Sequence, residues 1–466
     1  MLKRHSACHF MRTEEMLKLI YLEELRNKTH NLKCFDLQLS LDNDNITITN
    51  PYNSNKLYYL HIDSKRIAIS DSYYELPDFK VSINGVLESI SEHFSSKPVF
   101  FENYHTLPHG FKFIFNLGKN TSEISRVNNN LAIDIDPVIC LHNTLKHINK
   151  DNIAISFSGG LDSTILLYSI KDSFPNKNIV AFNWYNKGTS NNDLLESRKI
   201  CKKLGIRLLK IEIAPDLLFI DLNTSKHYIP SFPSTYISYL GFIERYVFIL
   251  DKYFEGRPFT IVNGHGGDQI FYEDVPIEIF NLKNFFKYKS KLSDYVELYS
   301  LNYFSFIKSI TNLKFNFKLY KDKLINDTLY QTSTAFIKLP QHINFFYPFT
   351  SEEMIAYADN VDIFDTFDSM YTRCNIRQRF STYYNSNDFY RINKGHMTGA
   401  YQRALKTHKT KILKNLEYGK FKELNIRDMN VLLEKFSLAT MGVAGIDPSL
   451  LYVINFENIL KTLKGI

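Results

Sequence analysis

The 466-residue chain has few cysteines, a single tryptophan and no long apolar run. Its five cysteines are odd in number and far apart, with no CxxC pair, so we expect neither a disulfide framework nor a zinc site. The best apolar candidate, residues 236–250, is interrupted by Glu244 and Arg245, which excludes a membrane-spanning helix. No apolar run follows the basic N-terminus, so no secretory signal is expected. We therefore expect a cytoplasmic protein with reduced thiols.

Charge and composition also exclude several classes of protein. Lys and Arg number 56 against 49 Asp and Glu, and the net charge of +7 is spread without a run of five basic residues. A nucleic-acid partner is therefore not expected. Hydrophobic residues at 44% and charged residues at 23% are typical of globular proteins. The 15% of aromatic residues fits either large cores or a peptide-binding surface.

The first part of the chain has the pattern of short strands separated by turns. Apolar or alternating runs bounded by Asp and Asn clusters predict strands at 36–40, 46–49, 57–62, 66–70 and 111–115. These strands predict a small β-rich domain. Residues 119–130 are polar and rich in Asn, which predicts a linker.

After residue 151 strands and helices alternate. A helix is expected near 135–149, and the alternation predicts strands at 152–157, 179–184, 207–213 and 260–263, with helices at 162–171, 192–204 and 234–254. Short connections between them favour an α/β fold with a doubly wound parallel sheet over residues 150–275 and helices on both faces. Residues 276–466 are expected to be mostly helical.

The strongest local signal is SGGLDS, residues 158–163, between a strand and a helix. Gly159 and Gly160 let the backbone turn tightly and approach an anion. The N–H groups at the helix N-terminus and the hydroxyls of Ser158 and Ser163 favour phosphate there. Asp162 would repel a phosphate, so we expect Mg²⁺ between them. The alternative is an ordinary turn with Ser and Asp as helix caps. The spacing is not that of a Walker loop.

A second loop, residues 263–271 (NGHGGDQIF), directly follows another expected strand. In open α/β sheets ligands bind beyond the carboxyl ends of the strands, so both loops should face one site. Asp268 would then share Mg²⁺ with Asp162, and Gly264 and His265 would lie beside the nucleotide. The alternative for His265 is a loop histidine bonded only to backbone.

With these two loops, residues 130–420 resemble the synthetase domain of the asparagine synthetase family of ATP pyrophosphatases, which includes β-lactam synthetases and lasso-peptide macrolactam cyclases. SGGLDS matches the family's ATP loop, GHGGDQIF resembles its G-x-G-x-D-x-x-F loop, and residues 191–206 resemble the helix after the ATP loop. Residues 56–70 and 102–115 resemble the hairpin and L-P-x-G turn of its glutaminase-type domain. The resemblance implies a degenerate class II glutamine amidotransferase-like domain in residues 1–125 and an ATP-binding catalytic domain in residues 130–466.

Three departures favour the cyclases within this family. A working glutaminase needs Cys directly after the initiator Met, but Leu2 stands there and Cys8 is too far along the chain. His265 occupies the position where asparagine synthetases usually carry Glu, β-lactam synthetases Tyr and the cyclases commonly His. Residues 388–404 resemble the R-x-x-K-G stretch of the cyclases, with Lys394 in the place of their lysine.

The resemblance implies a ligase that uses ATP and Mg²⁺. It would adenylate an Asp or Glu side chain of a precursor peptide and close a macrolactam with the peptide's N-terminal amine, releasing AMP and pyrophosphate. His265 would act as general base, since an imidazole titrates near neutral pH. Lys394 would neutralise charge on the phosphates. Asp327 is a candidate acidic partner of His265, although its spacing fits the family poorly.

Other interpretations of these residues and of the chain stay open. Lys394 could be a surface lysine, while Arg373 and Arg377, four apart, could bind a phosphate or be exposed helix arginines. As a cyclase the protein would work with a leader-peptide recognition protein and a leader protease. The rivals are a small-molecule amide synthetase, of the β-lactam or ammonia-dependent asparagine type, and a catalytically silent scaffold.

Overall fold

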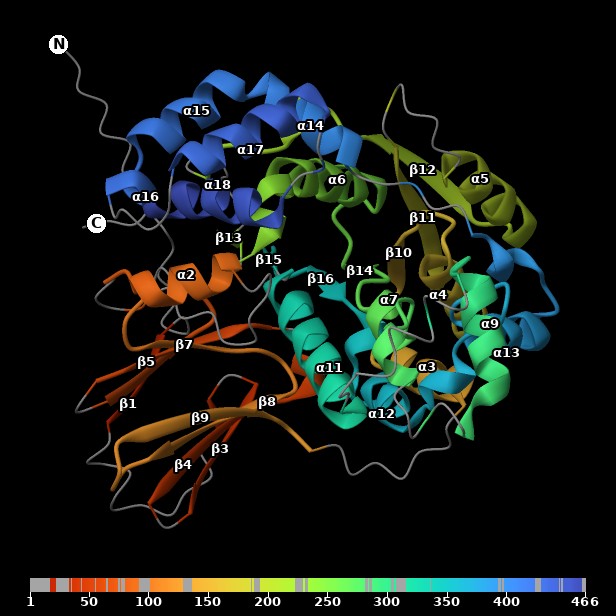
Figure 1. Ribbon diagram of the computed structural model, residues 1–466, viewed down its shortest axis with the longest axis horizontal. Coiled ribbons are helices and arrows are strands. Elements are labelled where there is room, and N and C mark those ends of the chain that lie inside the picture. The colour runs from red at the N-terminus through yellow and green to blue at the C-terminus, as the bar shows by residue number, and fades with distance from the viewer. Residues whose placement is uncertain are drawn as a thin grey trace.

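The computed structural model in Figure 1 combines antiparallel sheets, one parallel sheet and a helical C-terminal region. The structure describes residues 17–21, 33–34, 36–42, 44–54, 56–63, 66–73, 76, 80–91, 101–128, 136–185, 187, 193–222, 229–230, 234–280, 284, 287–302, 306, 316–335, 337–392, 395, 398–423, 429–443, 445 and 447–462. Leu2, Cys8 and Lys394 lie outside these ranges.

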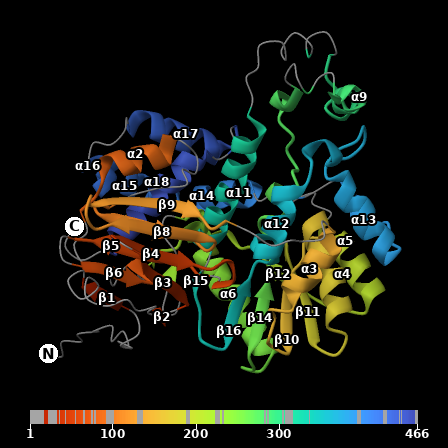
Figure 2. The same cartoon turned by 90° about the horizontal axis from the view of Figure 1, so that it is seen from below.

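The N-terminal strands form two antiparallel sheets that lie against one another in Figures 1 and 2. The four-stranded sheet has the order β1 (Leu17–Tyr21), β6 (Arg66–Ser70), β5 (Tyr58–Ile62), β7 (Tyr104–Leu107). The five-stranded sheet has the order β2 (Lys33–Cys34), β3 (Leu37–Asp42), β4 (Asn45–Asn50), β8 (Phe111–Asn116), β9 (Thr121–Arg126). The five strands expected from the sequence are confirmed.

Alternation of apolar and polar residues explains how these sheets pack. Along β8 every second residue is buried, and Phe113 is completely so. Phe113 belongs to the same core as Ile48 of its own sheet and Leu60 of the other. The two inner faces therefore form one core, as in other stacked sheets.

The linker expected at 119–130 is wrong, because part of it is strand β9, which pairs antiparallel with β8. Its first three residues are exposed and the rest half-buried, since β9 is the edge of its sheet. A polar edge strand has no apolar alternation, and it has the same composition as a linker.

The parallel sheet has the order β12 (Arg207–Glu212), β11 (Asn178–Tyr185), β10 (Asn152–Ser156), β14 (Phe259–Val262), β16 (Ile343–Phe346). All four neighbouring pairs are parallel. The expected boundary at residue 275 is wrong, because β16 comes from the region expected to be helical. Its four residues are too short a run to stand out among aromatic-rich helices.

Both faces of this sheet are covered, as a doubly wound fold requires. Ile155 of β10 packs in one core with Ile165 of helix α4 (Leu161–Ser173). Its neighbour Ala154 faces the other side, in the core that contains Tyr246 of α6 (Leu240–Tyr253). The helix expected at 234–254 begins with a separate 3-10 turn, η5 (Thr235–Tyr239).

The remaining helices of the described residues precede the parallel sheet in the chain, lie between its strands or follow it. They are α2 (Ile83–Ser91), α3 (Pro137–Leu145), α5 (Asp193–Leu204), α7 (Gly267–Ile270), α9 (Lys289–Leu298), α11 (Phe317–Thr334), α12 (Glu352–Asn360), α13 (Cys374–Tyr384), α14 (Thr398–Thr407), α15 (Lys409–Tyr418), α16 (Lys420–Glu423), α17 (Met429–Met441) and α18 (Pro448–Leu460). In Figure 1 α2 lies between the four-stranded sheet and α18. Among the residues that the structure describes, no helix combines the length and apolar character needed to cross a bilayer.

Polar contacts attach the N-terminal sheets to the rest of the chain. Arg126, the last residue of β9, donates to both carboxylate oxygens of Asp359 on α12, at 2.7 and 3.1 Å, and to Asp322 on α11 at 2.9 Å. The buried His109 donates its backbone N–H to the hydroxyl of Ser333 at the end of α11. The edge strand β9 is thus bound to the helices beside the parallel sheet.

We expect Ile261→Ala to lower the free energy of unfolding by about 2–5 kcal/mol, because Ile261 is fully buried in β14 and its removal leaves a cavity. Urea unfolding followed by circular dichroism measures the change. Ile139→Ala is the matched control, since Ile139 on α3 is 43% exposed. Equal losses for the two variants would contradict this assignment of the core.

Candidate functional site

The SGG loop leaves β10 and turns directly into α4. Gly159 has φ of +74°, in the left-handed region that favours glycine. A Cβ on Gly159 would also lie 3.3 Å from the backbone nitrogen of Ser197 and 3.1 Å from the guanidinium of Arg391. The hydroxyl of Ser163 donates to Gly160 O at 3.1 Å, and that of Ser158 accepts from Gly160 N at 3.2 Å. Both glycines and both serines therefore fix the turn itself.

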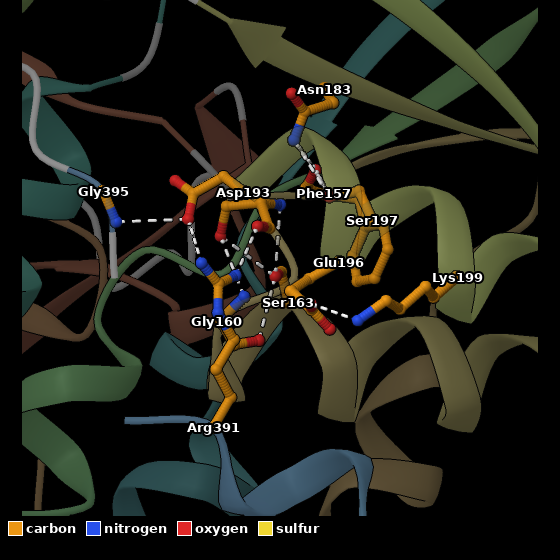
Figure 3. A network of polar contacts seen from close by, with 11 residues as sticks. Phe157, Gly160, Ser163, Asn183, Asp193, Glu196, Ser197, Lys199, Arg391 and Gly395 are labelled. Carbon is orange, nitrogen blue, oxygen red and sulfur yellow. Dashed lines mark hydrogen bonds and ion pairs between the residues drawn. The ribbon is translucent and has the colours of Figure 1, made fainter. Parts of the chain in front are cut away.

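Two buried side chains hold the backbone just before this loop. Asn183, near the end of β11, donates to the carbonyl oxygen of Phe157 at 2.8 Å, and the hydroxyl of Ser197 on α5 donates to the same oxygen at 3.2 Å (Figure 3). Asn183 also donates to that hydroxyl at 2.9 Å. The neighbouring strand and the next helix thus fix where the SGG loop begins.

An ion pair joins the start of α5 to a segment from the far C-terminal part of the chain. Arg391 binds the carboxylate of Asp193 and donates to the carbonyl oxygen of Ser158 at 3.1 Å. The N–H of Gly395 donates to Asp193 at 3.1 Å (Figure 3). Lys394 itself lies outside the described residues. Its described neighbours on both sides are attached to one carboxylate beside the phosphate loop.

The second loop packs directly on the first. A Cβ on Gly264 would lie 3.3 Å from the Cβ of Asp162, and one on Gly267 would lie 2.7 Å from its carboxylate carbon. Gly266 has φ of +92°, and a Cβ there would meet a methyl of Thr350 at 2.9 Å. A side chain at Gly267 would therefore force Asp162 to move, and one at Gly264 would crowd it. The sequence-based prediction that both loops share one edge of the sheet agrees with this contact.

One guanidinium lies between the two predicted metal-binding carboxylates. Nη1 of Arg373 donates to Oδ1 of Asp162 and to Oδ1 of Asp268, both at 2.9 Å. Nη2 of Arg373 donates to Glu273 at 2.9 Å. Because both aspartate oxygens accept a hydrogen bond from the same nitrogen, they must lie close together. Burial opposes the charge of Arg373, but the three carboxylates outweigh it and hold its pKa above the ordinary value.

Neither arginine of the expected pair is an exposed helix residue. Arg373 precedes α13 with φ of +56° and is only 3% exposed. Arg377 is also buried and donates to the carbonyl oxygens of Thr372, Phe389 and Arg391. Burial, followed by the nearby charge of Arg373, lowers the pKa of Arg377. Arg377 therefore supports the segment that carries Arg391.

His265 is half-buried and lies among aromatic side chains. Its Nδ1 is 3.2 Å from the phenol oxygen of Tyr236, and its ring makes edge contacts with Tyr236 and Tyr347. Its backbone N–H donates to the side chain of Asn263 at 3.0 Å. Burial raises the pKa of Tyr236 well above its usual value, so the phenol stays protonated at neutral pH. The interpretation of His265 as a histidine bonded only to backbone is wrong.

Asp327 lies half-buried on α11, the helix that packs on α7. The next residue, Thr328, has a methyl 3.3 Å from the Cβ position of Gly266. Asp327 thus comes from the element that adjoins the His265 loop. Its pairing with His265 stays a prediction, as do the roles of the other site residues.

The donor set fits a divalent cation that is shared with phosphate. Asp162 and Asp268 offer the carboxylate oxygens that Mg²⁺ prefers, and a cationic group already lies between them. Among the described residues no cluster of three or more His, Cys, Asp and Glu side chains is arranged to hold a metal. Phosphate oxygens and water would therefore have to complete the coordination, as is usual for Mg²⁺ with nucleotides.

Sequence reasoning missed three residues of this site. Asp193 and Arg391 are 198 residues apart, so no local pattern could pair them. Tyr236 lies 29 residues before His265 in an aromatic-rich stretch that resembles any core helix. The sequence places Asp193 only in the helix expected at 192–204. Their partners could be found only in three dimensions.

Comparison with known protein families gives a match over the phosphate-loop region. The family model described as NAD synthase matches residues 136–228, which contain β10, α4, β11, α5 and β12. This match covers the first motif and the helix after it, and supports an ATP-utilising ligase domain.

A curated relative extends the similarity over more of the chain. Microcin J25-processing protein McjC from Escherichia coli is 22% identical over 338 residues, 68% of this chain. The aligned part spans 62% of the relative's own length. Together with the family match, this supports the resemblance to the asparagine synthetase-like family and, within it, to the lasso-peptide cyclases.

Solved structures match weakly. The NH3-dependent NAD synthetase from Campylobacter jejuni, in complex with nitrate, is 20% identical over 17% of this chain and 37% of its own, with a TM-score of 0.15. The U34-tRNA thiolase NcsA from Methanococcus maripaludis is 13% identical over 59% of this chain and 80% of its own, with a TM-score of 0.23. Scores of this size do not establish a common overall fold.

We expect Asp193→Ala to lower the free energy of unfolding by about 3–5 kcal/mol, because it leaves the largely buried Arg391 without its carboxylate. Urea unfolding measures this loss, and an ATP titration should show weaker binding. Glu196→Ala is the control on the same helix, since the Glu196–Lys199 pair is partly exposed and should matter by less than about 1 kcal/mol. A change at Asp193 no larger than at Glu196 would contradict the role of this ion pair.

Proposed function

We propose that this protein is an ATP-dependent macrolactam ligase that adenylates an Asp or Glu side chain of a precursor peptide and joins it to the peptide's N-terminal amine. The observation that carries the proposal is the contact between the two loops. SGGLDS and the His265 loop meet so closely that Asp162 and Asp268 bind the same nitrogen of Arg373. A phosphate loop, two convergent carboxylates and an imidazole on adjoining loops are the groups that adenylation and amide formation need.

The chemistry has two steps. The peptide carboxylate attacks the α-phosphorus of ATP, which forms a mixed anhydride with AMP and releases pyrophosphate. The amine then attacks the activated carbonyl, loses a proton and expels AMP, so that an amide forms. Mg²⁺, held by Asp162 and Asp268 when bound, would offset charge on the phosphates. The loop at 158–163 would bind pyrophosphate.

Each protein group has a defined task in this proposal. His265 would accept the proton of the attacking amine, and Tyr236 would hold the ring through Nδ1. Lys394 would neutralise the growing charge on pyrophosphate, carried by the segment that Arg391 and Gly395 attach to Asp193. Asp327 would act as the acidic partner of His265. Since both reacting groups belong to one peptide, positioning would supply much of the rate.

The rest of the chain and the partners follow from the same proposal. Residues 1–125 would be a degenerate glutaminase-like domain, and residues 130–466 the catalytic domain. The relative named for processing microcin J25 supports a peptide substrate. A leader-peptide recognition protein and a leader protease would supply that substrate in the cytoplasm, without nucleic acid or membrane insertion.

A small-molecule amide synthetase is the second candidate. The match of residues 136–228 to the NAD synthase model favours it, because that model describes amide formation on a small substrate. It would use the same phosphate loop and the same carboxylates. The two candidates differ only in the acyl and amine substrates.

We expect pyrophosphate and AMP to form from Mg-ATP only when a leaderless peptide with a free N-terminal amine and an internal Asp or Glu is added. The product should be lighter than the peptide by one water, as mass spectrometry would show. Asp162→Asn keeps the side-chain shape but removes the charge, and should slow pyrophosphate release at least about a hundredfold. Lys119→Gln, at an exposed turn, is the charge-change control.

Turnover with aspartate and ammonium alone would contradict the peptide-ligase proposal and support the small-molecule amide synthetase. Full pyrophosphate release by Asp162→Asn would contradict the role assigned to Asp162. Absence of pyrophosphate with every substrate, together with equal ATP binding by wild type and Asp162→Asn, would contradict both candidates and favour the scaffold. Because the cyclase could require its protein partners, the assay is repeated with the leader peptide supplied in trans and with the recognition protein present.

We expect His265→Gln to separate the two steps. ATP–pyrophosphate exchange in the presence of peptide reports adenylation and should stay within about threefold of wild type, whereas macrolactam formation should fall about a hundredfold or more. His342→Gln is the matched control, since His342 is paired with Asp251 away from both loops. Parallel losses of exchange and ring closure would assign His265 to nucleotide binding instead.

A further inference from the structure

The cation that lies between Asp162 and Asp268 is a side chain of the protein, the guanidinium of Arg373. Arg373 places one nitrogen within 2.9 Å of both aspartate oxygens, at the place where the proposed function puts Mg²⁺. A guanidinium and a metal ion cannot occupy one place. We propose that Arg373 is a built-in counter-ion of the nucleotide-free enzyme, and that a divalent metal must displace it from these two oxygens.

The burial of the site explains why a counter-ion is needed. Asp162 is 8% exposed, and a second carboxylate lies within hydrogen-bonding range of the same nitrogen. Two ionised carboxylates this close repel one another strongly where little water screens them. Arg373 removes that repulsion before any metal arrives. The site can therefore stay preformed without its cofactor.

The other contacts of Arg373 show how it could leave. Its second terminal nitrogen is bonded to Glu273, whose side chain is 36% exposed and lies farther toward solvent than that of Asp162. When a metal ion binds the two aspartates, the guanidinium of Arg373 can stay hydrogen-bonded to Glu273. Nε of Arg373 is buried and has no hydrogen-bond partner among the described residues. This Nε–H donor is thus unsatisfied in the present arrangement, which favours a second position of the Arg373 side chain.

The backbone also sets Arg373 apart from its helix. Its φ of +56° is rare for a residue other than glycine, and it places Arg373 before the first turn of α13. The backbone therefore fixes where the side chain of Arg373 begins. Among the described residues, the hydrogen bonds of Arg377, one turn later, all go to backbone carbonyl oxygens. Arg377 therefore makes no hydrogen bond to either aspartate among the described residues, although its charge interacts with that of Asp162.

This inference rests on the proposed function only for the identity of the metal site, and Mn²⁺ without nucleotide or peptide tests it. The concentration of free Mn²⁺ is measured by electron paramagnetic resonance during titration of the 466-residue protein. We expect Arg373→Gln to bind Mn²⁺ about tenfold or more tightly than wild type, because a competing positive charge has been removed. Arg373→Lys, which keeps the charge, should stay near wild type.

Arg379→Gln is the matched control, since Arg379 lies on the same helix but pairs with Asp136 away from the loops. Its Mn²⁺ affinity should change by less than about twofold, because solvent and salt screen the more distant charge. Equal or weaker Mn²⁺ binding by Arg373→Gln would overturn the proposal. That result would stand whether or not a peptide is ever cyclised, so it is distinguishable from failure of the proposed function.

The variant could depend on metal for folding, since it leaves the carboxylates of buried Asp162 and half-buried Asp268 without the charge of Arg373. Thermal unfolding with and without Mn²⁺ covers this case. Mn²⁺ should raise the melting temperature of Arg373→Gln more than that of wild type, and a variant that folds only with Mn²⁺ would support the proposal. A variant that stays unfolded at saturating Mn²⁺, or gains no more than wild type, would count against it.

Discussion

The site depends on one electrostatic constraint: the carboxylates of buried Asp162 and half-buried Asp268 lie close together and need a cation between them. Asp162 belongs to the loop after β10 and Asp268 to the loop after β14, and these two strands are neighbours in the parallel sheet. Their carboxylates converge only because Gly264 and Gly267 let the backbones approach without a Cβ between them. Arg373 brings a third part of the chain to the same point. The two loops and the start of α13 are therefore fixed together.

A second ion pair makes the phosphate loop dependent on distant sequence in the same way. Asp193 begins α5, yet it holds Arg391 and Gly395, which come from the segment between α13 and α14. Arg391 in turn contacts Ser158. The segment that includes the predicted lysine is thus attached to the loop that it would serve. Such long-range attachment would suit the proposed peptide ligase, in which positioning of the two reacting groups supplies much of the rate.

The sequence predicts a strand well where burial imposes a pattern of apolar residues, and poorly where it does not. Strands with alternating or continuous apolar residues, such as β4 and β10, were predicted within one or two residues because burial imposes that pattern. The residues of edge strand β9 have the pattern of a linker because no face of the strand is fully buried. Strand β16 was missed because four apolar residues do not distinguish a strand from a buried helix. For the site, the two loops were found because glycines and acidic residues follow strand ends at fixed spacings.

Residue patterns alone predict the alternating strands and helices around 151–263 and the two glycine-rich loops after β10 and β14, because backbone turns and helix termini depend on local chemistry. The tertiary structure alone decided what neutralises Asp162 and Asp268, what contacts His265 and what holds the segment with Arg391. Those partners lie 29 to 211 residues apart, and no local pattern encodes them. Their pairing follows from the order of strands in the sheet, which brings chain segments together irrespective of their separation in sequence.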